Sequence, residues 1–234
     1  MQKILITNDD GIQSDGIIRL ARVAKKYGEV WVVAPDGQRS AMSHRITLRE
    51  TIEFFPVDFP VEGVHAYAST GTPADCVRFG ILNIVKEKPD YVFSGINYGY
   101  NSGTDIQYSA TVGSALEAAC AGVHAVAFSE GASECHEVTD AYLERMMEEL
   151  MEQPLAYNQI WNVNFPQCEL EKLRGILYDR KIADCGFFID EYLEEELENG
   201  RIRLTVHGNY NENAMPRRER ISGHLLMDIF QLGR

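Results

Sequence analysis

Residues 4–12, ILITNDDGI, join a short apolar run to two adjacent carboxylates. The run at 4–6 is typical of a strand that is buried on both faces of a parallel sheet. Asp9 and Asp10 follow in the turn, where their like charges repel each other and burial disfavours the charged form of each. A divalent cation would relieve both effects, because hard cations prefer oxygen ligands. The alternative interpretation of this segment is a plain turn and helix cap.

Length and composition indicate one globular domain, or one domain with an appendage. The chain has 234 residues, of which 45% are hydrophobic, and this is enough for a sizeable core. Its net charge of −13 argues against stable binding to nucleic acid, which needs a basic surface. The charge does not exclude a small anionic substrate, because a bound metal can invert the local field.

Other features of the sequence predict a cytoplasmic protein. No apolar run is long enough to cross a membrane, so we expect no membrane contact. The N-terminal residues lead directly into strand sequence, without the pattern of a signal peptide. The five cysteines are odd in number and scattered, which favours reduced thiols over a disulfide framework or a zinc site.

Strand-like and helix-like segments alternate through most of the chain. Segments typical of strands lie at 4–6, 29–35, 53–57, 65–70, 90–96, 124–130, 160–166 and 201–208. Helices are predicted at 14–28, 72–87, 109–122, 139–153 and 191–200. We expect Thr72 and Thr139 to cap two of these helices, and Gly28 and Gly200 to end two others. Buried strands separated by helices predict an α/β fold, with a mostly parallel sheet and helices on both faces.

Three polar loops follow the carboxyl ends of predicted strands, at 8–11, 36–47 and 94–113. In parallel sheets, ligands bind in the crevice beyond the carboxyl ends of the strands. We therefore expect the three loops to meet at one edge of the sheet and to form one site.

The loop at 94–113 has the composition of a phosphate-binding loop. It carries several glycines and leads into the helix predicted at 109–122. Glycines let backbone amides approach an anion, and the helix N-terminus points its amides to the same place. Neither the P-loop pattern nor the dinucleotide fingerprint is present. The alternative is a packed surface loop without a ligand, although loops of this length are usually functional.

The loop at 36–47 offers further polar groups. Ser40 could bind the metal or donate to phosphate, while His44 could be a general acid or lie in solvent. Arg39 and Arg45 could bind phosphate or be solvated. A metal site beside phosphate donors suggests metal-assisted hydrolysis. The cation would polarise the phosphoryl group and activate a water molecule, and an aspartate free of the metal would receive the water proton.

Five segments carry a resemblance to a known family: ILITNDDGI, APDGQRSAMSHRIT, GTPADCV, SGINYGYNSGTDIQYSATVGSALEA and WNVNFP. In this order they resemble the motifs of the survival protein SurE family of metal-dependent nucleotidases. The similarity runs from residue 1 to about residue 166, so it covers most of the chain.

The resemblance implies a Rossmann-like catalytic domain, residues 1–166, and a C-terminal extension, residues 167–234, used to form a homodimer or homotetramer. It implies hydrolysis of nucleoside 5′- and 3′-monophosphates by metal-activated water, with one divalent cation, magnesium or manganese, per subunit. Some members also cleave short polyphosphate. The final segment 218–234 departs from the family's usual ending, which bears on oligomer geometry and on the base-binding rim rather than on the chemistry.

The resemblance also implies the site residues. The expected metal ligands are Asp9, Asp10, Ser40 and Asn97, and the expected catalytic residues are Asp9, Asp10 and Asn97. The expected contacts to substrate or its phosphate are Asn8, Asn101, Ser102, Gly103, Thr104, Ser109 and Thr111. Asp105 matches the family's loop aspartate, but we expect it to be a structural hydrogen-bond acceptor. We expect Thr72 and Asp75 only to cap a helix.

Two other functions remain open from the sequence. One is a broad acid phosphatase or exopolyphosphatase, and the other is a nucleotide-binding module without turnover. A dehydrogenase of the same general fold is disfavoured, because the dinucleotide fingerprint is absent.

Overall fold

The computed structural model describes residues 1–178, 180, 182, 186, 188–210 and 224–231. Most of segment 218–234, which departs from the family pattern, lies outside these residues, as does Cys185. The described cysteines are free thiols, as predicted: Cys76, Cys120, Cys135 and Cys168. None of the described helices is both long and apolar enough to cross a membrane.

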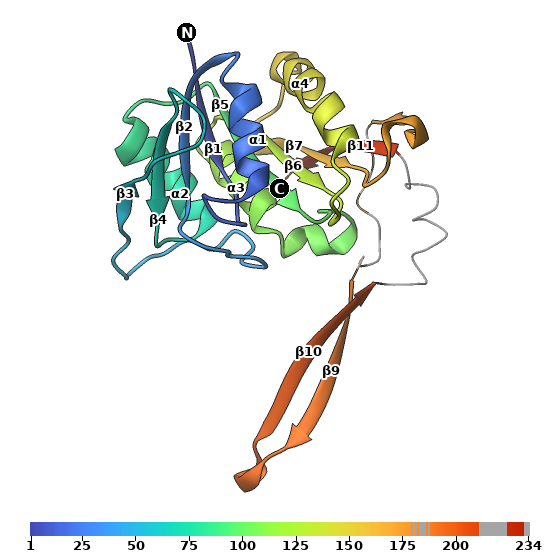
Figure 1. Cartoon of the computed structure of the whole chain (residues 1–234). Coiled ribbons are helices and arrows are strands. Elements are labelled where there is room, and N and C mark those ends of the chain that lie inside the picture. Colours follow the sequence, from blue (N-terminus) through green and yellow to red (C-terminus); the bar gives the residue numbers. More distant parts are fainter. Residues whose placement is uncertain (179, 181, 183–185, 187, 211–223, 232–234) are drawn as a thin grey trace.

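A nine-stranded sheet forms the centre of the described structure (Figure 1). Its strands are β1 (Gln2–Thr7), β2 (Gly28–Pro35), β3 (Phe54–Pro56), β4 (His65–Ser69), β5 (Tyr91–Tyr98), β6 (His124–Glu130), β7 (Gln159–Phe165), β8 (Gly175–Leu177) and β11 (His224–Gln231). They lie in the order β3-β4-β2-β1-β5-β6-β7-β11-β8. Pairing from β4 to β7 is parallel, while β3 and β11 run antiparallel to β4 and β7. The predicted fold, α/β with a mostly parallel sheet, is confirmed.

Helices cover both faces of this sheet (Figure 1). One face carries α1 (Asp15–Ala24) and α4 (Glu137–Glu152), and the other carries α2 (Pro73–Phe79) and α3 (Ala110–Cys120). Ile4 and Ile6 of β1 belong to the core beneath α1 and α4, whereas Leu5 belongs to the core beneath α2 and α3. Successive strand side chains point to opposite faces. The unbroken apolar run of β1 therefore supplies both cores.

Two helices have boundaries that differ from the predictions. Helix α1 ends at Ala24, and Gly28 begins β2 instead of ending the helix. Helix α4 starts earlier than predicted, with His136 at its N-cap. The predicted cap at Thr139 is wrong, because that residue lies in the first turns of the helix and is buried against the core.

The predicted N-terminus of α2 is confirmed. Asp75 N donates to Thr72 Oγ1 at 3.1 Å, and Thr72 N donates to Asp75 Oδ2 at 2.9 Å, which is a reciprocal capping box. Helix α2 then widens into a π-helical segment, Gly80–Val85, within the predicted helical range.

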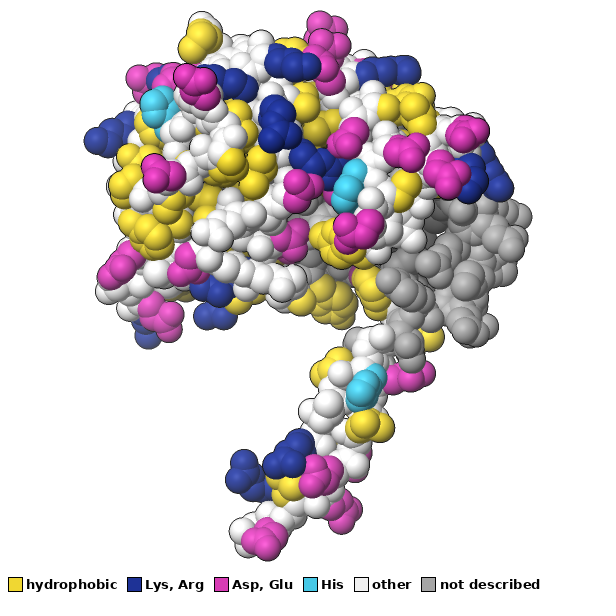
Figure 2. Space-filling view, in the orientation of Figure 1, with side chains coloured by type: hydrophobic (Ala, Val, Ile, Leu, Met, Phe, Trp, Pro, Cys, Tyr) yellow, Lys and Arg dark blue, Asp and Glu magenta, His cyan; other side chains and the backbone are white. Residues whose placement is uncertain are grey.

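Two strands form a hairpin outside the main sheet (Figure 1). They are β9 (Phe188–Glu196) and β10 (Ile202–Tyr210), which pair antiparallel, and Figure 2 shows apolar and charged side chains interleaved along them. The helix predicted at 191–200 is therefore wrong. Pairing with the β-branched residues of β10 outweighs the helix propensity of the glutamates. Arg203 also forms a cross-strand ion pair with Glu195 at 2.8 Å.

The main sheet continues past residue 166. Strands β8 and β11 come from the predicted extension, yet both pair within the sheet. The hairpin of β9 and β10 also belongs to the extension and forms a separate sheet. The division of the chain into 1–166 and 167–234 stays a prediction.

Candidate metal and phosphate site

The side chain of Asn8 holds the turn after β1. Its amide nitrogen donates to Gly11 O at 2.9 Å and to Ser14 Oγ at 2.7 Å, and its oxygen accepts from Gly11 N at 3.2 Å. Gly11 has a φ of +98°, a region that favours glycine. These bonds fix the turn that carries Asp9 and Asp10. A contact between Asn8 and substrate stays a prediction.

Asp9 is a buried carboxylate without a cationic partner among the described residues. The residue is only 4% exposed, and Thr111 Oγ1 donates to its Oδ1 at 2.5 Å. Burial raises the pKa of Asp9 to about 7, the Thr111 hydrogen bond opposes this effect, and the charge of Asp10 adds to it. A buried anion of this kind is costly unless a cation compensates it.

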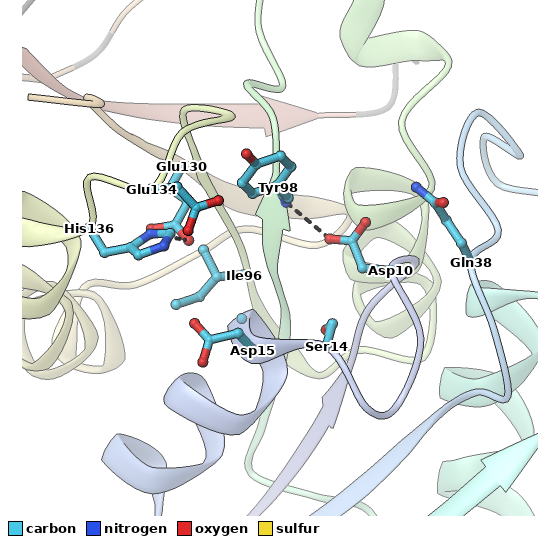
Figure 3. Close-up of a pocket in the computed structure, with 10 residues that line it drawn as sticks. Asp10, Ser14, Asp15, Gln38, Ile96, Tyr98, Glu130, Glu134 and His136 are labelled. Atoms are coloured by element: carbon cyan, nitrogen blue, oxygen red, sulfur yellow. Dashed lines mark hydrogen bonds and ion pairs between the residues drawn. The ribbon is translucent and has the colours of Figure 1, made fainter.

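Asp10 is fixed by a different segment of the chain. Its Oδ2 accepts a hydrogen bond from Tyr98 N at 3.0 Å, as Figure 3 shows. Burial raises the pKa of Asp10, the Tyr98 hydrogen bond opposes this effect, and the charge of Glu130 adds to it. The charges of both aspartates are therefore uncompensated among the described residues, although their side chains contact opposite ends of the segment 94–113.

The second predicted loop lies directly against this turn. Arg39 N donates to Asp9 O at 2.7 Å, so Ser40 is one residue away from that contact. Ser40 Oγ accepts from Gln38 Nε2 at 3.1 Å. The guanidinium of Arg39 contacts Asp36, with Nη2 3.0 Å from Oδ1.

The same loop also packs on α3. Ser43 N donates to Tyr108 O at 3.0 Å, and a Cβ at Gly113 would lie 2.4 Å from Ser43 O, so the close approach requires glycine. His44 Nε2 lies 2.7 Å from Glu117 Oε2, and this bond is the main cause of the lowered pKa of Glu117. His44 is thus bonded to α3 and does not lie free in solvent, while a role as general acid stays a prediction.

The third loop meets the other two at the start of α3. Ser109 caps this helix, because its Oγ accepts a hydrogen bond from Val112 N at 3.1 Å. Thr111, in the first turn of the helix, donates the hydrogen bond to Asp9. The preceding turn, Gly103–Gln107, is a 3-10 helix. Ser102, Gly103 and Thr104 lie at its beginning. The expected meeting of three loops at one edge of the sheet is confirmed, while their phosphate contacts stay predictions.

Asn101 contacts β6 and β7. It is buried, and its Nδ2 donates to Ser129 Oγ at 2.7 Å. Its carbonyl oxygen accepts from the side-chain amides of Asn162 and Asn164, each at 3.0 Å. These bonds brace the beginning of the third loop against the sheet.

A family model described as Survival protein SurE matches residues 4–184. The chain belongs to the SurE family. It is 39% identical over 216 residues to a protein from Clostridium botulinum (strain ATCC 19397 / Type A) named 5′-nucleotidase SurE, over 90% of this chain and 84% of the relative. A protein of the same name from Thermoanaerobacter sp. (strain X514) is 45% identical over 168 residues, 70% of this chain and 66% of the relative. The crystal structure of the SurE protein from Aquifex aeolicus is similar with a TM-score of 0.78 and 28% identity, covering 99% of this chain and 94% of that one.

The donors that the SurE resemblance predicts are chemically suited to a hard divalent cation. Asn97 Nδ2 donates to Gly99 O at 2.8 Å, and no described residue donates to its Oδ1. Together with Asp9, Asp10 and Ser40, this side chain offers carboxylate, hydroxyl and amide oxygens. Within the described part of the chain, no group of three or more His, Cys, Asp or Glu residues could hold a metal. The uncompensated aspartate pair therefore fits a cation whose other ligands are neutral.

Asp105 connects the SurE glycine-rich loop to the hairpin. Its Oδ2 accepts a hydrogen bond from Phe188 N, at the start of β9, at 2.8 Å. The prediction that Asp105 is a structural acceptor is confirmed.

A cleft of about 400 Å³ opens beside Asp10 (Figure 3). Of the residues that line it, sequence reasoning selected only Asp10; those that it missed include Tyr98, Glu130, Glu134 and His136. Glu130 is the last residue of β6, so a carboxylate at the carboxyl end of a strand was the signal that could have found it. Glu134 and His136 follow in the connection to α4, where their sequence shows no comparable signal.

Proposed function

We propose that this chain is a divalent-metal-dependent phosphohydrolase that removes phosphate from nucleoside 5′- and 3′-monophosphates. The observation that carries the proposal is the adjacent pair of Asp9, which is buried, and Asp10, which is partly buried; the pair has no cationic partner among the described residues. Similarity to proteins named 5′-nucleotidase SurE supports the substrate class.

One divalent cation per subunit, magnesium or manganese, would be held by Asp9, Asp10, Ser40 and Asn97. When bound, it would neutralise charge on the phosphoryl oxygens and make a water molecule a stronger nucleophile. Oxygen ligands suit both metals, so the donor set alone does not separate them.

The protein itself supplies orientation and anion binding. Thr111 fixes the carboxylate of Asp9, and the backbone of Tyr98 fixes that of Asp10. The N-terminus of α3 offers backbone amides and a positive dipole end beside Asp9, which favours a phosphate there. A carboxylate oxygen of the pair that is not used in ligation would accept the proton of the attacking water.

We infer further that the chain is a cytoplasmic homodimer or homotetramer that forms no stable complex with nucleic acid or membranes. The net charge of −13 supports the absence of nucleic-acid binding. The exposed apolar residues of the hairpin support self-association.

The test is phosphate release from 5′-AMP and 3′-AMP, with manganese and with EDTA, by the wild type, Asp9→Asn and the control Asp58→Asn. Asp58 is exposed and lies outside the site. We expect metal-dependent release by the wild type and the control, and loss of at least about 100-fold in Asp9→Asn, since losing even a residue that only supports a metal ligand costs about 10–100-fold.

Two results would favour the other functions. Faster release from an aryl phosphate or tripolyphosphate than from AMP would indicate a broad phosphatase or exopolyphosphatase. Tight AMP binding by the wild type with no phosphate released under either metal would indicate a binding module.

A further inference from the structure

The cleft beside Asp10 has the size and position of a substrate subsite. Its volume of about 400 Å³ lies within the range of about 300–1,000 Å³ for small-molecule sites. Asp10, Tyr98 and Glu130 bring it to the carboxyl edge of β1, β5 and β6, and Ser14 and Asp15 add the start of α1. It is therefore continuous with the proposed metal site.

We propose that this cleft holds the nucleoside part of the substrate, with the base against Tyr98 and the ribose hydroxyls at a wall formed by Glu134 and His136. The proposal rests on the proposed function, because Asp10 would then belong to both the metal site and the nucleoside subsite. It assigns recognition of the nucleoside to residues of this chain.

Tyr98 is suited to contact a base. Tyr98 is the last residue of β5 and is 51% exposed, so its ring is accessible to a ligand in the cleft. Its backbone nitrogen donates a hydrogen bond to Asp10 Oδ2, which fixes the backbone of Tyr98 next to the proposed metal ligand. Aromatic rings bind bases of any identity by stacking.

The opposite wall is built on a buried ion pair. Glu130 accepts from Arg19 Nη1 at 2.7 Å and from Nη2 at 3.3 Å, and His136 Nδ1 lies 3.1 Å from its Oε1. His136 thus lies at the wall of the cleft beside Glu130, on the same side as Glu134 in Figure 3. Glu134 is exposed and makes no ion pair with any described residue. Its carboxylate is therefore available to accept hydrogen bonds from sugar hydroxyls.

The charge of the cleft predicts which phosphates it rejects. Arg19 pairs with Glu130 and lies 3.5 Å from Asp15, which leaves Glu134 without a cationic partner among the described residues, whereas the proposed cation would compensate Asp10. Such a lining tolerates an uncharged sugar and base but repels further phosphate groups. The cleft therefore favours nucleoside monophosphates over polyphosphate.

The decisive measurement compares two inhibitors of AMP hydrolysis that each carry half of the substrate. Adenosine carries the nucleoside alone, and inorganic phosphate carries the phosphoryl group alone. In Tyr98→Ala we expect the inhibition constant of adenosine to rise about tenfold relative to that of phosphate, because the stacking contact with the base is lost. Tyr98→Phe keeps the ring and should behave as the wild type. Tyr157→Ala removes an exposed tyrosine outside the cleft and serves as the matched control.

Three outcomes would overturn the nucleoside subsite. The first is that adenosine does not inhibit the wild type, and the second is that its inhibition constant is unchanged in Tyr98→Ala. The third is that the inhibition constants of adenosine and phosphate change by the same factor. The last result would mean that the substitution disturbs Asp10 rather than the base contact.

A second variant tests whether the charge of the cleft repels polyphosphate. In Glu134→Gln we expect tripolyphosphate to inhibit about threefold more strongly at low salt, with the difference lost at high salt, as for an exposed charge. Glu62→Gln, at an exposed position away from the cleft, should leave inhibition unchanged. Equal inhibition of wild type and Glu134→Gln at low salt would contradict the charge selection.

A failure of the proposed function would be recognised separately. If the wild type releases no phosphate from AMP, the phosphohydrolase proposal fails, and adenosine binding is then measured by calorimetry in EDTA. Binding by the wild type that is lost in Tyr98→Ala would still support the nucleoside subsite. No heat of binding by the wild type would overturn it.

Discussion

Thr111 Oγ1 donates to Asp9 Oδ1 at 2.5 Å and so joins the start of α3 to the turn after β1. The hydroxyl stabilises the charged form of a carboxylate that burial drives toward the neutral form. A deprotonated carboxylate is the form that binds metal. This one contact therefore supports the charge state that the proposed site needs.

Replacing Thr111 by valine should weaken metal binding. The substitution keeps the shape of the side chain but removes the donor to Asp9, so more of the carboxylate stays protonated at neutral pH. We expect manganese affinity at pH 7 to fall about 10-fold, at the lower end of the range for residues that support a metal ligand. Titration calorimetry measures this, and Thr111→Ser should restore binding. Unchanged affinity in Thr111→Val would contradict the role given to the hydroxyl.

Asp9→Asn should abolish tight manganese binding while the fold survives. The amide keeps an oxygen that can accept the Thr111 hydrogen bond, but the charge that attracts the cation is lost. Calorimetry with manganese and circular dichroism are the measurements, with Asp58→Asn as the control. Normal affinity in Asp9→Asn, or an unfolded variant, would count against the assignment.

The metal-free protein should gain stability from Asp9→Asn at high pH. The pKa of Asp9 is about 7 in the folded chain against an ordinary value of 3.8, so above pH 4 the unfolded chain releases a proton that the folded chain retains. Wild-type stability therefore falls as the pH rises to about 7 and stays low above it.

Asparagine has no such titration. In EDTA we expect Asp9→Asn to be more stable than the wild type by on the order of 2 kcal/mol at pH 8, with little difference near pH 4. Urea unfolding at the two pH values gives the comparison. A variant that loses stability at pH 8 would show that Asp9 is not a strained anion in the metal-free protein.

The hairpin should control self-association through one of its faces. The register of β9 with β10 places Tyr192, Val206, Leu204 and Ile202 on the same face, and each is at least half exposed. We expect Leu204→Asp to shift the protein toward monomer in analytical ultracentrifugation. Thr205→Asp adds the same charge on the other face and should have a smaller effect. Identical sedimentation of wild type and Leu204→Asp would rule out this face as the contact.

Local signals in the sequence were sufficient for most of the main sheet. The cap at Thr72 stands beside its proline and Asp75, and the run at 4–6 is apolar because β1 feeds two cores. The proposed cation site was also predictable from local sequence, because two adjacent aspartates repel each other and this repulsion needs a compensating charge.

Features that depend on a distant partner were not predictable in this way. Glutamates 194–196 favour a helix until β10 is placed opposite them, and only the pairing of strands decides their conformation. The cleft has the same origin, because Asp10 and Glu130 become neighbours only when β1, β5 and β6 lie side by side. No spacing in the sequence expresses that proximity.

The bond from Phe188 N to Asp105 fastens one end of the hairpin to the loop that leads into α3. A second subunit that binds the hairpin would therefore also act on the loop that leads into α3, through this hydrogen bond. Dilution that separates the subunits would at the same time make the loop that contains Asp105 less ordered. Turnover per subunit would then rise with protein concentration, and the cell could set the enzyme's specific activity by how much of it is made.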